Sequence, residues 1–481
     1  MMKIHNKYRN VFFLLMMTSF FRLFGQVEKP TWSSDKVTEE SYYTIGTQAY
    51  IYSVTPFMMY AVLYQTQQIP YEGYPNGVSF NAWTKVNTLA NVKNSRTVMA
   101  NVNTLYASTW LDLRKEPIIL EIPEFGNRYY SVALQDAYMN HFSILGSRTI
   151  GGYGGKFMIC GPDYNGVIPS GFTKIESPTP FVWMLMRIAP TYANEKEIEV
   201  CRKLQADVTI TPLSQINNTR YNPSTYNEKL NLGVPDVSKD PLSFFEIVHQ
   251  YMQINPPPKG EAALMALFRQ IGFNPEQDFS IDKLTEPQRK GLLRAVESGK
   301  EMINTYITNG DNIYNGWTIQ SKEMGSYGYS YLTRAALTMQ SIGGFPWEEA
   351  IYVVGYKDIK GNELDGSINN YLLHFNKNEI PQVNDFWSLT MYELPSVMLY
   401  DNAINRYQMG PQIEEMKHNK DGSLDIYIQH NKPKEKNKQG NWLPSPAGKF
   451  VLSMRMYNPK SNMFQLDAHK VPLPGIQPIK K

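Results

Sequence analysis

Cysteine is scarce in this chain, which has two among its 481 residues, Cys160 and Cys201. No CxxC pair and no Cys/His spacing is present that would form a structural zinc site. In an oxidising compartment the two thiols could form one disulfide, and the alternative is two free, buried thiols. The sequence leaves both alternatives open, because a disulfide depends on the distance between the two Cα atoms in the fold.

An excess of charge is also lacking. The formal net charge is +3, and the one long basic run is KPKEKNKQ at 432–439. Proteins that bind nucleic acid usually carry a strong basic patch. The composition therefore argues against a nucleic-acid partner, and the basic run is interpreted as a solvated loop.

Several cofactor and catalytic motifs are missing from the sequence. It has no Walker loop, no GxGxxG after a strand, no GxSxG turn and no HExxH. These absences argue against nucleotide cofactors, serine-hydrolase chemistry and zincin chemistry, and we expect no cofactor. Calcium bound by Asp and Asn oxygens is the one cation kept open. The acidic segments DGSLD at 421–425 and DIKGNELDG at 358–366 do not fit an EF-hand loop, however, and are interpreted as hairpin turns.

Long apolar runs are confined to the N-terminus. Residues 1–26 place Lys3, Lys7 and Arg9 before an apolar run, a pattern typical of a secretory signal peptide. A buried helix, the alternative, would leave the basic flank unexplained. No comparable run follows, and the first later cysteine is Cys160, so neither a membrane anchor nor a lipid anchor is expected. The sequence predicts release into the periplasm or the medium.

The rest of the chain has an ordinary globular composition, with 42% hydrophobic and 19% charged residues. Its length exceeds what one hydrophobic core usually serves, so two domains are expected. Apolar spacing predicts helices over 35–65 and 241–309, and short strands separated by Gly, Pro and Asn over 96–187 and 325–470. The predicted boundaries are a signal peptide at 1–26, an N-terminal helix with a first β-sandwich at 27–235, a helical connecting segment at 236–315 and a second β-sandwich at 316–481.

Two sequence patterns occur once in each strand-rich half. RYYSVALQ at 128–135 is echoed by DFWSLTMY at 385–392, and SPTPFVWMLMR at 177–187 is echoed by SPAGKFVLSMR at 445–455. The order is the same in both halves, which indicates a shared topology and an ancient duplication. Short strands at near-regular spacing predict a mainly β fold of two jelly-roll-like antiparallel β-sandwich domains with helical connections.

Longer motifs resemble a bacterial two-domain family. NVNTLYASTWLDL at 101–113 and RYYSVALQDAYMN at 128–140 are similar to domain of unknown function 1254. SYGYSYLTRAAL at 326–337 and NWLPSPAGKFVLSMRMY at 441–457 are similar to its usual partner, domain of unknown function 1214. The resemblance implies two jelly-roll-like β domains with helical connections, and it implies no function. Members of the family usually carry Asp where this chain has Asn103, which argues against an acid–base role at that position.

Tyrosine is abundant, with 32 residues, many of them beside Asn and Arg in these motifs. An aromatic ring with a polar end suits sugar rings as well as protein cores. In a strand over 386–392 alternate side chains face opposite sides, so Tyr392 could line a cleft while Trp387 points the other way. Asp136 and Tyr138 end the more apolar face of the strand at 128–135. They are pocket candidates, and the alternative is that they are hydrogen-bonded core residues.

The first functional hypothesis is an exported lyase or dehydratase that acts on uronic-acid-containing oligosaccharides. β-Elimination beside a carboxylate needs a cation to offset the enolate charge, a base to remove the proton and an acid to protonate the departing oxygen. The catalytic candidates are Arg148 or Arg406 as the cation, His141 or Tyr138 as the base, and Tyr392 or Tyr407 as the acid. The candidates for substrate binding are Asn103, Tyr106, Asp136, Arg334, Trp387 and Asn405.

Two alternatives stay open at this point. One is a non-catalytic periplasmic protein that binds glycan or assembles the envelope, with another copy of the chain as a partner in a homo-oligomer. The other is a glycoside hydrolase, which needs two carboxylates about 5–10 Å apart. Convergence of the polar motif residues would favour an enzyme, and dispersal would favour binding. In a structural role, the arginines Arg148, Arg334 and Arg406 would pair with Asp112, Asp136 or Asp401.

Overall fold

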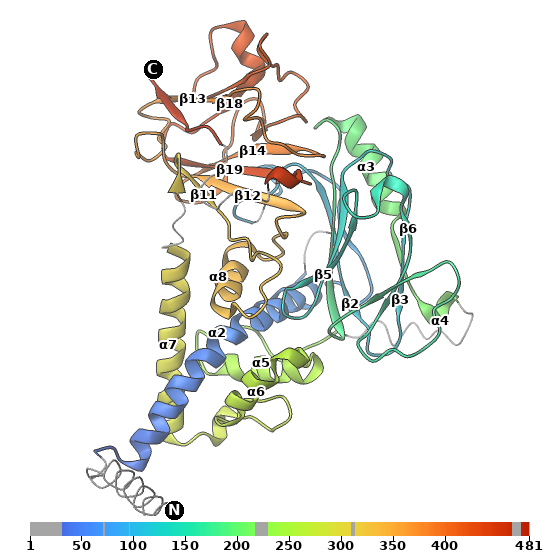
Figure 1. Ribbon diagram of the computed structural model, residues 1–481, viewed down its shortest axis with the longest axis vertical. Coiled ribbons are helices and arrows are strands. Elements are labelled where there is room, and N and C mark those ends of the chain that lie inside the picture. The colour runs from blue at the N-terminus through green and yellow to red at the C-terminus, as the bar shows by residue number, and fades with distance from the viewer. Residues whose placement is uncertain are drawn as a thin grey trace, which may run out of the picture.

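The computed structural model describes residues 31–70, 73–95, 97–216, 229–308, 313–463 and 473–480. It contains two β-sandwiches, one from each half of the sequence, and a group of helices beside them (Figure 1). The predicted signal peptide at 1–26 lies outside the described residues.

The helical layer is built around the long helix α2, Ser34–Gln68. Ser33 caps this helix, because its hydroxyl accepts a hydrogen bond from the Lys36 backbone nitrogen at 3.2 Å. Helix α7, Glu286–Thr308, packs closely along α2, since a Cβ atom on Gly291 would lie 2.4 Å from the Glu39 carbonyl oxygen. The other helices of this layer are α5 Ser243–Ile254, α6 Ala262–Arg269 and α8 Tyr331–Ser341.

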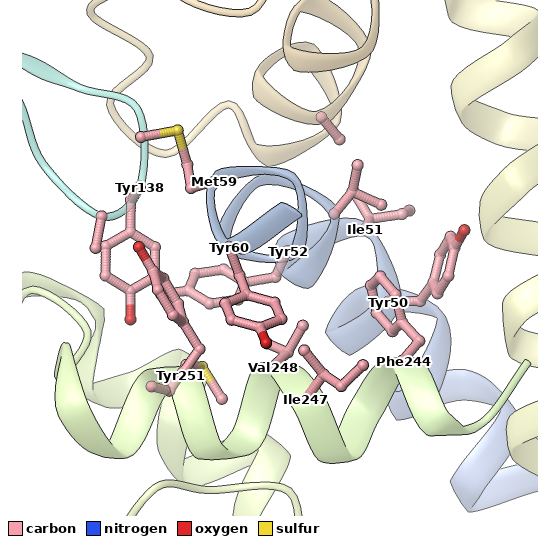
Figure 2. Packing of buried hydrophobic residues seen from close by; sticks show 14 of the residues in the cluster. Tyr50, Ile51, Tyr52, Met59, Tyr60, Tyr138, Phe244, Ile247, Val248 and Tyr251 are labelled. Atoms are coloured by element: carbon pink, nitrogen blue, oxygen red, sulfur yellow. The ribbon is translucent and has the colours of Figure 1, made fainter. Parts of the chain in front are cut away.

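Aromatic side chains fill the core of the helical layer. Figure 2 shows Tyr50, Tyr52 and Tyr60 of α2 beside Phe244 and Tyr251 of α5. The ring centroids of Tyr50 and Phe244 are 4.8 Å apart. The tyrosines of α2 and α5 shown there therefore serve packing between helices.

The first sandwich packs two sheets around an apolar core. The first sheet has the order β1-β2-β8-β4-β5 and the second has the order β7-β6-β3-β9. The strands are β1 Thr84–Val86, β2 Leu105–Asp112, β3 Ile118–Ile122, β4 Tyr130–Gln135, β5 His141–Gly146, β6 Gly155–Cys160, β7 Thr173–Glu176, β8 Phe181–Ile188 and β9 Thr209–Pro212. Alternation along β4 turns Val132 and Leu134 into this core, so Ser131 and Ala133 face away from it. Helices α3, Glu195–Asp207, and α4, Leu213–Ile216, flank this sandwich.

The second sandwich repeats this arrangement around its own core. Its first sheet has the order β10-β11-β12-β19-β14-β15, with β16 also paired to β14, and its second sheet has the order β18-β17-β13-β20. The strands are β10 Ile313–Tyr314, β11 Trp317–Ile319, β12 Ala350–Gly355, β13 Asn370–Phe375, β14 Trp387–Glu393, β15 Met398–Leu399, β16 Gln408–Met409, β17 Leu424–Gln429, β18 Trp442–Pro444, β19 Phe450–Tyr457 and β20 Gln477–Ile479. Trp387, Leu389 and Met391 of β14 point into this core, as the alternation predicts.

The structure confirms the mainly β fold with an N-terminal helix and further helices. The strand pairs β6–β7 and β17–β18 are parallel, and the other described pairs are antiparallel. The jelly-roll strand order stays a prediction. Cys160 and Cys201 are free and buried, so the free-thiol alternative is the right one. None of the helices in the described ranges has the length and apolar character needed to cross a membrane.

Candidate functional site

Each sandwich turns the outer face of one sheet toward the other sandwich. These are the sheet that contains β2, β8 and β4 and the sheet that contains β12, β19 and β14, and we call them the central sheets. Tyr129, just before β4, packs against Phe386 and Tyr457 of the second sandwich, with ring centroids 5.5 and 5.1 Å apart. The Tyr392 hydroxyl on β14 donates to the Ala100 carbonyl oxygen, in the segment before β2, at 2.6 Å. Polar side chains lie between the two sheets, and we call the following set the inter-sheet cluster: Tyr106, Tyr129, Ser131, Arg187, Tyr352, Ser388, Thr390, Tyr392, Arg455 and Tyr457.

The same three residue types lie side by side on three neighbouring strands of each central sheet. The two rows are Tyr106–Arg187–Ser131 on β2, β8 and β4, and Tyr352–Arg455–Ser388 on β12, β19 and β14. The echoed sequence patterns supply the arginine and the serine of both rows. The strand orders β2-β8-β4 and β12-β19-β14 also correspond. The repeat in the sequence is therefore a repeat in register and in side-chain position.

Arg187 is buried, with 6% of its surface exposed. Its Nη2 donates to the Gly343 carbonyl oxygen at 3.1 Å, and its Nη1 lies 3.4 Å from the Tyr352 hydroxyl. Its Nε has no hydrogen-bond partner within the described protein. The guanidinium carbon lies 3.7 Å from the centroid of the Phe345 ring. Arg187 thus has a cation–π contact and two neutral acceptors, but forms no ion pair with any carboxylate of the described ranges.

Arg455, the equivalent residue of the second row, is also 6% exposed. Its Nη1 donates to the Tyr392 hydroxyl at 2.9 Å and to Thr390 Oγ1 at 3.2 Å, and its Nη2 donates to the Met99 carbonyl oxygen at 2.7 Å. No described carboxylate forms an ion pair with it either. Because a guanidinium stays protonated, the inter-sheet cluster buries two positive charges without carboxylate partners.

Three tyrosine hydroxyls of the cluster accept hydrogen bonds from nitrogen. Asn101 Nδ2 lies 2.9 Å from the Tyr106 hydroxyl and 3.0 Å from the Tyr457 hydroxyl, and the Tyr352 hydroxyl faces Arg187. No described residue accepts the proton of any of these three hydroxyls. Burial raises the pKa of Tyr352 and of Tyr457, so both phenols keep their protons at neutral pH. The cluster therefore holds unused O–H donors beside its two cations.

Parts of the cluster keep solvent-accessible surface although they lie between the sandwiches. Tyr106 and Tyr352 are half-buried, whereas Leu105 and Ile351, their neighbours on the opposite face, are fully buried. Ser388 Oγ is buried without a protein partner. Buried polar groups usually bind water or a ligand when the protein supplies no partner. Accessible surface and unpaired polar atoms in one place are features of a binding site.

His141 begins β5 beside the cluster. Both of its ring nitrogens are shielded from solvent and lack a partner in the described part of the chain. Its ring centroid is 5.8 Å from that of Phe345, the residue that stacks on Arg187. Burial, and in second place the charge of Arg187, lower the pKa of His141 to about 3. The imidazole is therefore neutral at physiological pH, with a lone pair on one nitrogen.

Four of the sequence-predicted site residues lie in or beside the cluster. Tyr106 and Tyr392 belong to it, and His141 adjoins it. Asn103 precedes β2, and its Nδ2 donates to Gln412 Oε1 of the second half at 2.6 Å. Its Oδ1 is buried without a protein partner. The amide at this position joins the two halves.

Three other predicted residues meet in the helical layer. Arg334 of α8 is 1% exposed and lies 3.8 Å from the Glu261 carboxylate. Its guanidinium carbon is 5.7 Å from the ring centroid of Tyr138. The Asp136 carboxylate accepts hydrogen bonds from the backbone nitrogens of Tyr138 and Asn140, both at 2.9 Å. The Asp136 bonds close the turn after β4, and Tyr138 lies beside Arg334 of α8, whose Nε and Nη2 are buried without a hydrogen-bond partner in the described ranges.

The two arginines predicted as catalytic cations already have protein partners. Arg148 Nε donates to Glu349 at 2.7 Å. Arg406 donates to the carbonyl oxygens of Gln439 and Trp442 at 3.0 and 3.1 Å. The expectation that the three arginines pair with Asp112, Asp136 or Asp401 is wrong, because their ion-pair partners are Glu349, Glu261 and Glu415.

The last three predicted residues lie outside the cluster. The Tyr407 hydroxyl donates to Asn405 Oδ1 at 3.2 Å, within the loop before β16. Trp387 is 3% exposed in the core of the second sandwich. None of these contacts places a reactive group beside Arg187 or Arg455.

Sequence reasoning missed the two arginines of the cluster, as well as Tyr352 and Tyr457. The signal was present, because Arg187 and Arg455 each end a copy of the echoed Ser-Pro pattern. Taken by itself, that pattern predicts a shared topology and no functional site. The sequence does not show that the outer faces of the two sheets meet, and only this meeting brings Arg187 beside Tyr352 and Tyr457 of the second half.

Metal ligands do not gather in the described ranges: no group of three or more His, Cys, Asp and Glu side chains there is placed to hold an ion. The segment at 358–366 forms a tight turn, in which the backbone nitrogens of Lys360 and Asn362 donate to Asp358 Oδ1 at 2.8 and 2.9 Å. The Asp358 carboxylate therefore closes a turn, as the sequence predicts for this segment.

Two solved structures are similar to this chain. The VPA0106 protein from Vibrio parahaemolyticus is similar at 23% identity with a TM-score of 0.71, covering 91% of this chain and 100% of that one, and it has the same fold. A putative uncharacterized protein from Burkholderia cenocepacia is similar at 9% identity with a TM-score of 0.43, covering 93% of this chain and 98% of that one. No curated protein was found to match.

Two family descriptions match the two halves of the chain. Protein of unknown function (DUF1254) matches residues 80–212, which span the first sandwich, and Protein of unknown function (DUF1214) matches residues 349–461, which span most of the second. The chain belongs to the two-domain family that combines domain of unknown function 1254 in its N-terminal half with domain of unknown function 1214 in its C-terminal half.

Proposed function

We propose that the protein is an exported enzyme that acts on uronic-acid-containing oligosaccharides by β-elimination, as a dehydratase or a lyase. The observation that carries the proposal is the pair of buried arginines without carboxylate partners. Leaving a buried charge unpaired costs several kcal/mol, on the order of 3–5. A substrate carboxylate that binds there would offset this cost, and bidentate hydrogen bonding to a guanidinium would orient it.

The excess of donors in the cluster supports an oxygen-rich substrate. Tyr106, Tyr352 and Tyr457 each offer an O–H, and Arg187 Nε offers an N–H, with no protein acceptor in the described ranges. Sugar hydroxyl and carboxylate oxygens accept hydrogen bonds. A site with many donors and few acceptors favours such a ligand over an apolar or cationic one.

The elimination step assigns a role to three kinds of side chain. An arginine stabilises the negative charge that develops on the carboxylate when the neighbouring C–H bond breaks. His141, which is neutral and adjoins the cluster, accepts that proton, and a substrate carboxylate on Arg187 would offset the positive charge that helps to lower the pKa of His141. The electron pair of the C–H bond forms the C=C bond while the C–O bond beyond it breaks. The departing oxygen takes a proton from Tyr106, whose hydroxyl has no acceptor among the described residues.

A non-catalytic glycan-binding protein is the second candidate, and one observation favours it. The phenols of Tyr352, Tyr392 and Tyr457 have raised pKa values because of burial, so they donate hydrogen bonds but do not act as bases. The groups beside the cluster that can accept a proton in the described ranges are then His141 and the Glu349 carboxylate. The hydrolase alternative needs two carboxylates, whereas the only described carboxylate bonded to a cluster residue is Glu349, through Tyr129.

The test is incubation of residues 27–481 with a panel of uronic-acid-containing oligosaccharides, followed by mass spectrometry. A product that has lost one water without chain cleavage indicates a dehydratase, and cleavage with an unsaturated end indicates a lyase. The Arg187→Gln variant is expected to lose product formation by about 100-fold or more, as for removal of a transition-state donor. Arg269→Gln, on the exposed side of α6, is the matched control. Binding without any product from the whole panel would exclude the enzyme.

A further inference from the structure

We infer that the inter-sheet cluster binds two acidic groups at once, one on Arg187 and one on Arg455, and therefore selects ligands with two carboxylates, such as two uronic-acid units of one oligosaccharide. The inference rests on the proposed function for the chemical class of the ligand. It goes beyond that function by giving each arginine an acidic group of its own.

The first support is the repeated geometry. Arg187 and Arg455 occupy the same position in corresponding sheets, each between a tyrosine on one neighbouring strand and a serine on the other. Their surroundings overlap, because Tyr106 and Tyr457 interact electrostatically with both guanidiniums. Two equivalent cations that share neighbours form two halves of one site.

The second support is the number of unused N–H donors. A guanidinium has five N–H groups. Arg187 makes two hydrogen bonds to described residues, and Arg455 makes three. Arg187 thus keeps three donors and Arg455 keeps two. Bidentate recognition of a carboxylate takes two donors, so each arginine has enough for one acidic group.

The third support is the charge balance of the cluster. Its two arginines are positive, whereas Tyr352, Tyr457 and the adjacent His141 are neutral. Among the described residues, the carboxylate hydrogen-bonded to a cluster residue is Glu349, which accepts from Tyr129 and is paired with Arg148 at 2.7 Å. A ligand with one negative charge would leave one buried arginine uncompensated, and a ligand with two would compensate both.

The experiment compares three probes by calorimetry at constant ionic strength: a disaccharide with two uronic-acid units, the same disaccharide with one carboxyl group reduced to an alcohol, and inorganic phosphate. The His141→Gln variant is used beside the wild-type chain to slow turnover. We expect the diacid to bind at least about tenfold more tightly than the monoacid, because a hydrogen bond to a charged group contributes this much. We expect phosphate to compete weakly, since it offers one acidic group where the inferred site binds two.

Two variants then locate the acidic groups. Arg187→Lys and Arg455→Lys keep the charge and remove bidentate geometry, and each is expected to abolish the preference for the diacid. Equal binding of diacid and monoacid by the wild-type chain, strong competition by phosphate, or a preference that survives either substitution would overturn the inference. The wild-type comparison needs no variant to fold. Tight diacid binding without any product would contradict the proposed enzyme only, and product formation with equal binding of both acids would contradict this inference only.

Discussion

Glu349 provides the sharpest test of how the two sandwiches are joined. Its carboxylate is 1% exposed, accepts a hydrogen bond from the Tyr129 hydroxyl at 2.9 Å and pairs with Arg148 at 2.7 Å. Both partners belong to the first sandwich, whereas Glu349 precedes β12 of the second. We predict that Glu349→Ala lowers the free energy of unfolding, while Glu349→Gln does not.

The expected size of the loss follows from what each substitution leaves unpaired. Gln keeps an oxygen for Arg148, and its amide can donate to the Tyr129 oxygen. Ala leaves the Tyr129 hydroxyl in a buried place with only Ser131 Oγ as an acceptor, at 3.3 Å, and removes packed atoms as well. Arg148 is 28% exposed, so water can solvate it. Because it has an unpaired buried group and a small cavity, Glu349→Ala should have a free energy of unfolding about 2–3 kcal/mol lower than that of Glu349→Gln.

The pH dependence gives the same prediction a second readout. Burial raises the pKa of Glu349 above its ordinary value of 4.5, although Arg148 acts in the opposite direction. A carboxyl group with a raised pKa in the folded state contributes stability below its unfolded pKa and loses it as the pH rises through the folded pKa. The wild-type chain should therefore lose stability relative to Glu349→Gln as the pH rises from the ordinary carboxyl range through the raised pKa of Glu349.

Urea unfolding measures both effects, with the midpoint interpreted at constant slope. The comparison of Ala with Gln isolates the lost acceptor, and the comparison of wild type with Gln isolates the charge. A difference between Ala and Gln below about 0.5 kcal/mol, the usual range for surface substitutions, would refute the assigned role of Glu349.

Three further predictions concern packing and thiols. Gly291→Ala should lower the free energy of unfolding by about 1–3 kcal/mol, because the added Cβ would lie 2.4 Å from a backbone oxygen of α2. Gly448→Ala, where the Cβ would lie in open space, is the control and should change this free energy by less than about 0.5 kcal/mol. Urea unfolding of both variants checks the prediction. Trp387→Ala should lower the free energy of unfolding by about 3–5 kcal/mol in the same assay, and a smaller loss would contradict the place of Trp387 in the core of the second sandwich. A reducing agent should leave the melting temperature unchanged, since Cys160 and Cys201 are free, and a decrease would reveal a disulfide.

Local patterns predicted the fold well where one element decides the outcome. The apolar spacing at 35–65 predicted α2, and period-two alternation predicted that Trp387 and Tyr392 face opposite sides of β14. These properties depend on near neighbours in the sequence, so the sequence carries them directly.

Partners that are distant in the sequence could not be predicted in this way. Arg148 and Glu349 are 201 residues apart, and Asn103 and Gln412 are 309 apart. Charge and hydrogen-bonding type allow many such pairs, and only the packing of the sandwiches selects one. The same limit hid the inter-sheet cluster, since the echo identified equivalent strands but not the meeting of their outer faces.

The matched Tyr–Arg–Ser rows of the two central sheets bear on how this chain could have evolved. A single-sandwich ancestor with one Tyr–Arg–Ser row could assemble the whole cluster only as a symmetric dimer, with identical side chains on both sides. Fusion of two copies into one chain removes that requirement, so each half is free to change alone. This chain shows such divergence, because Gln135 in one half corresponds to Tyr392 in the other, and Ala133 corresponds to Thr390. For the sugar chain that we propose as the ligand, which has a reducing and a non-reducing end, two rows that differ in this way favour one direction of binding over the other.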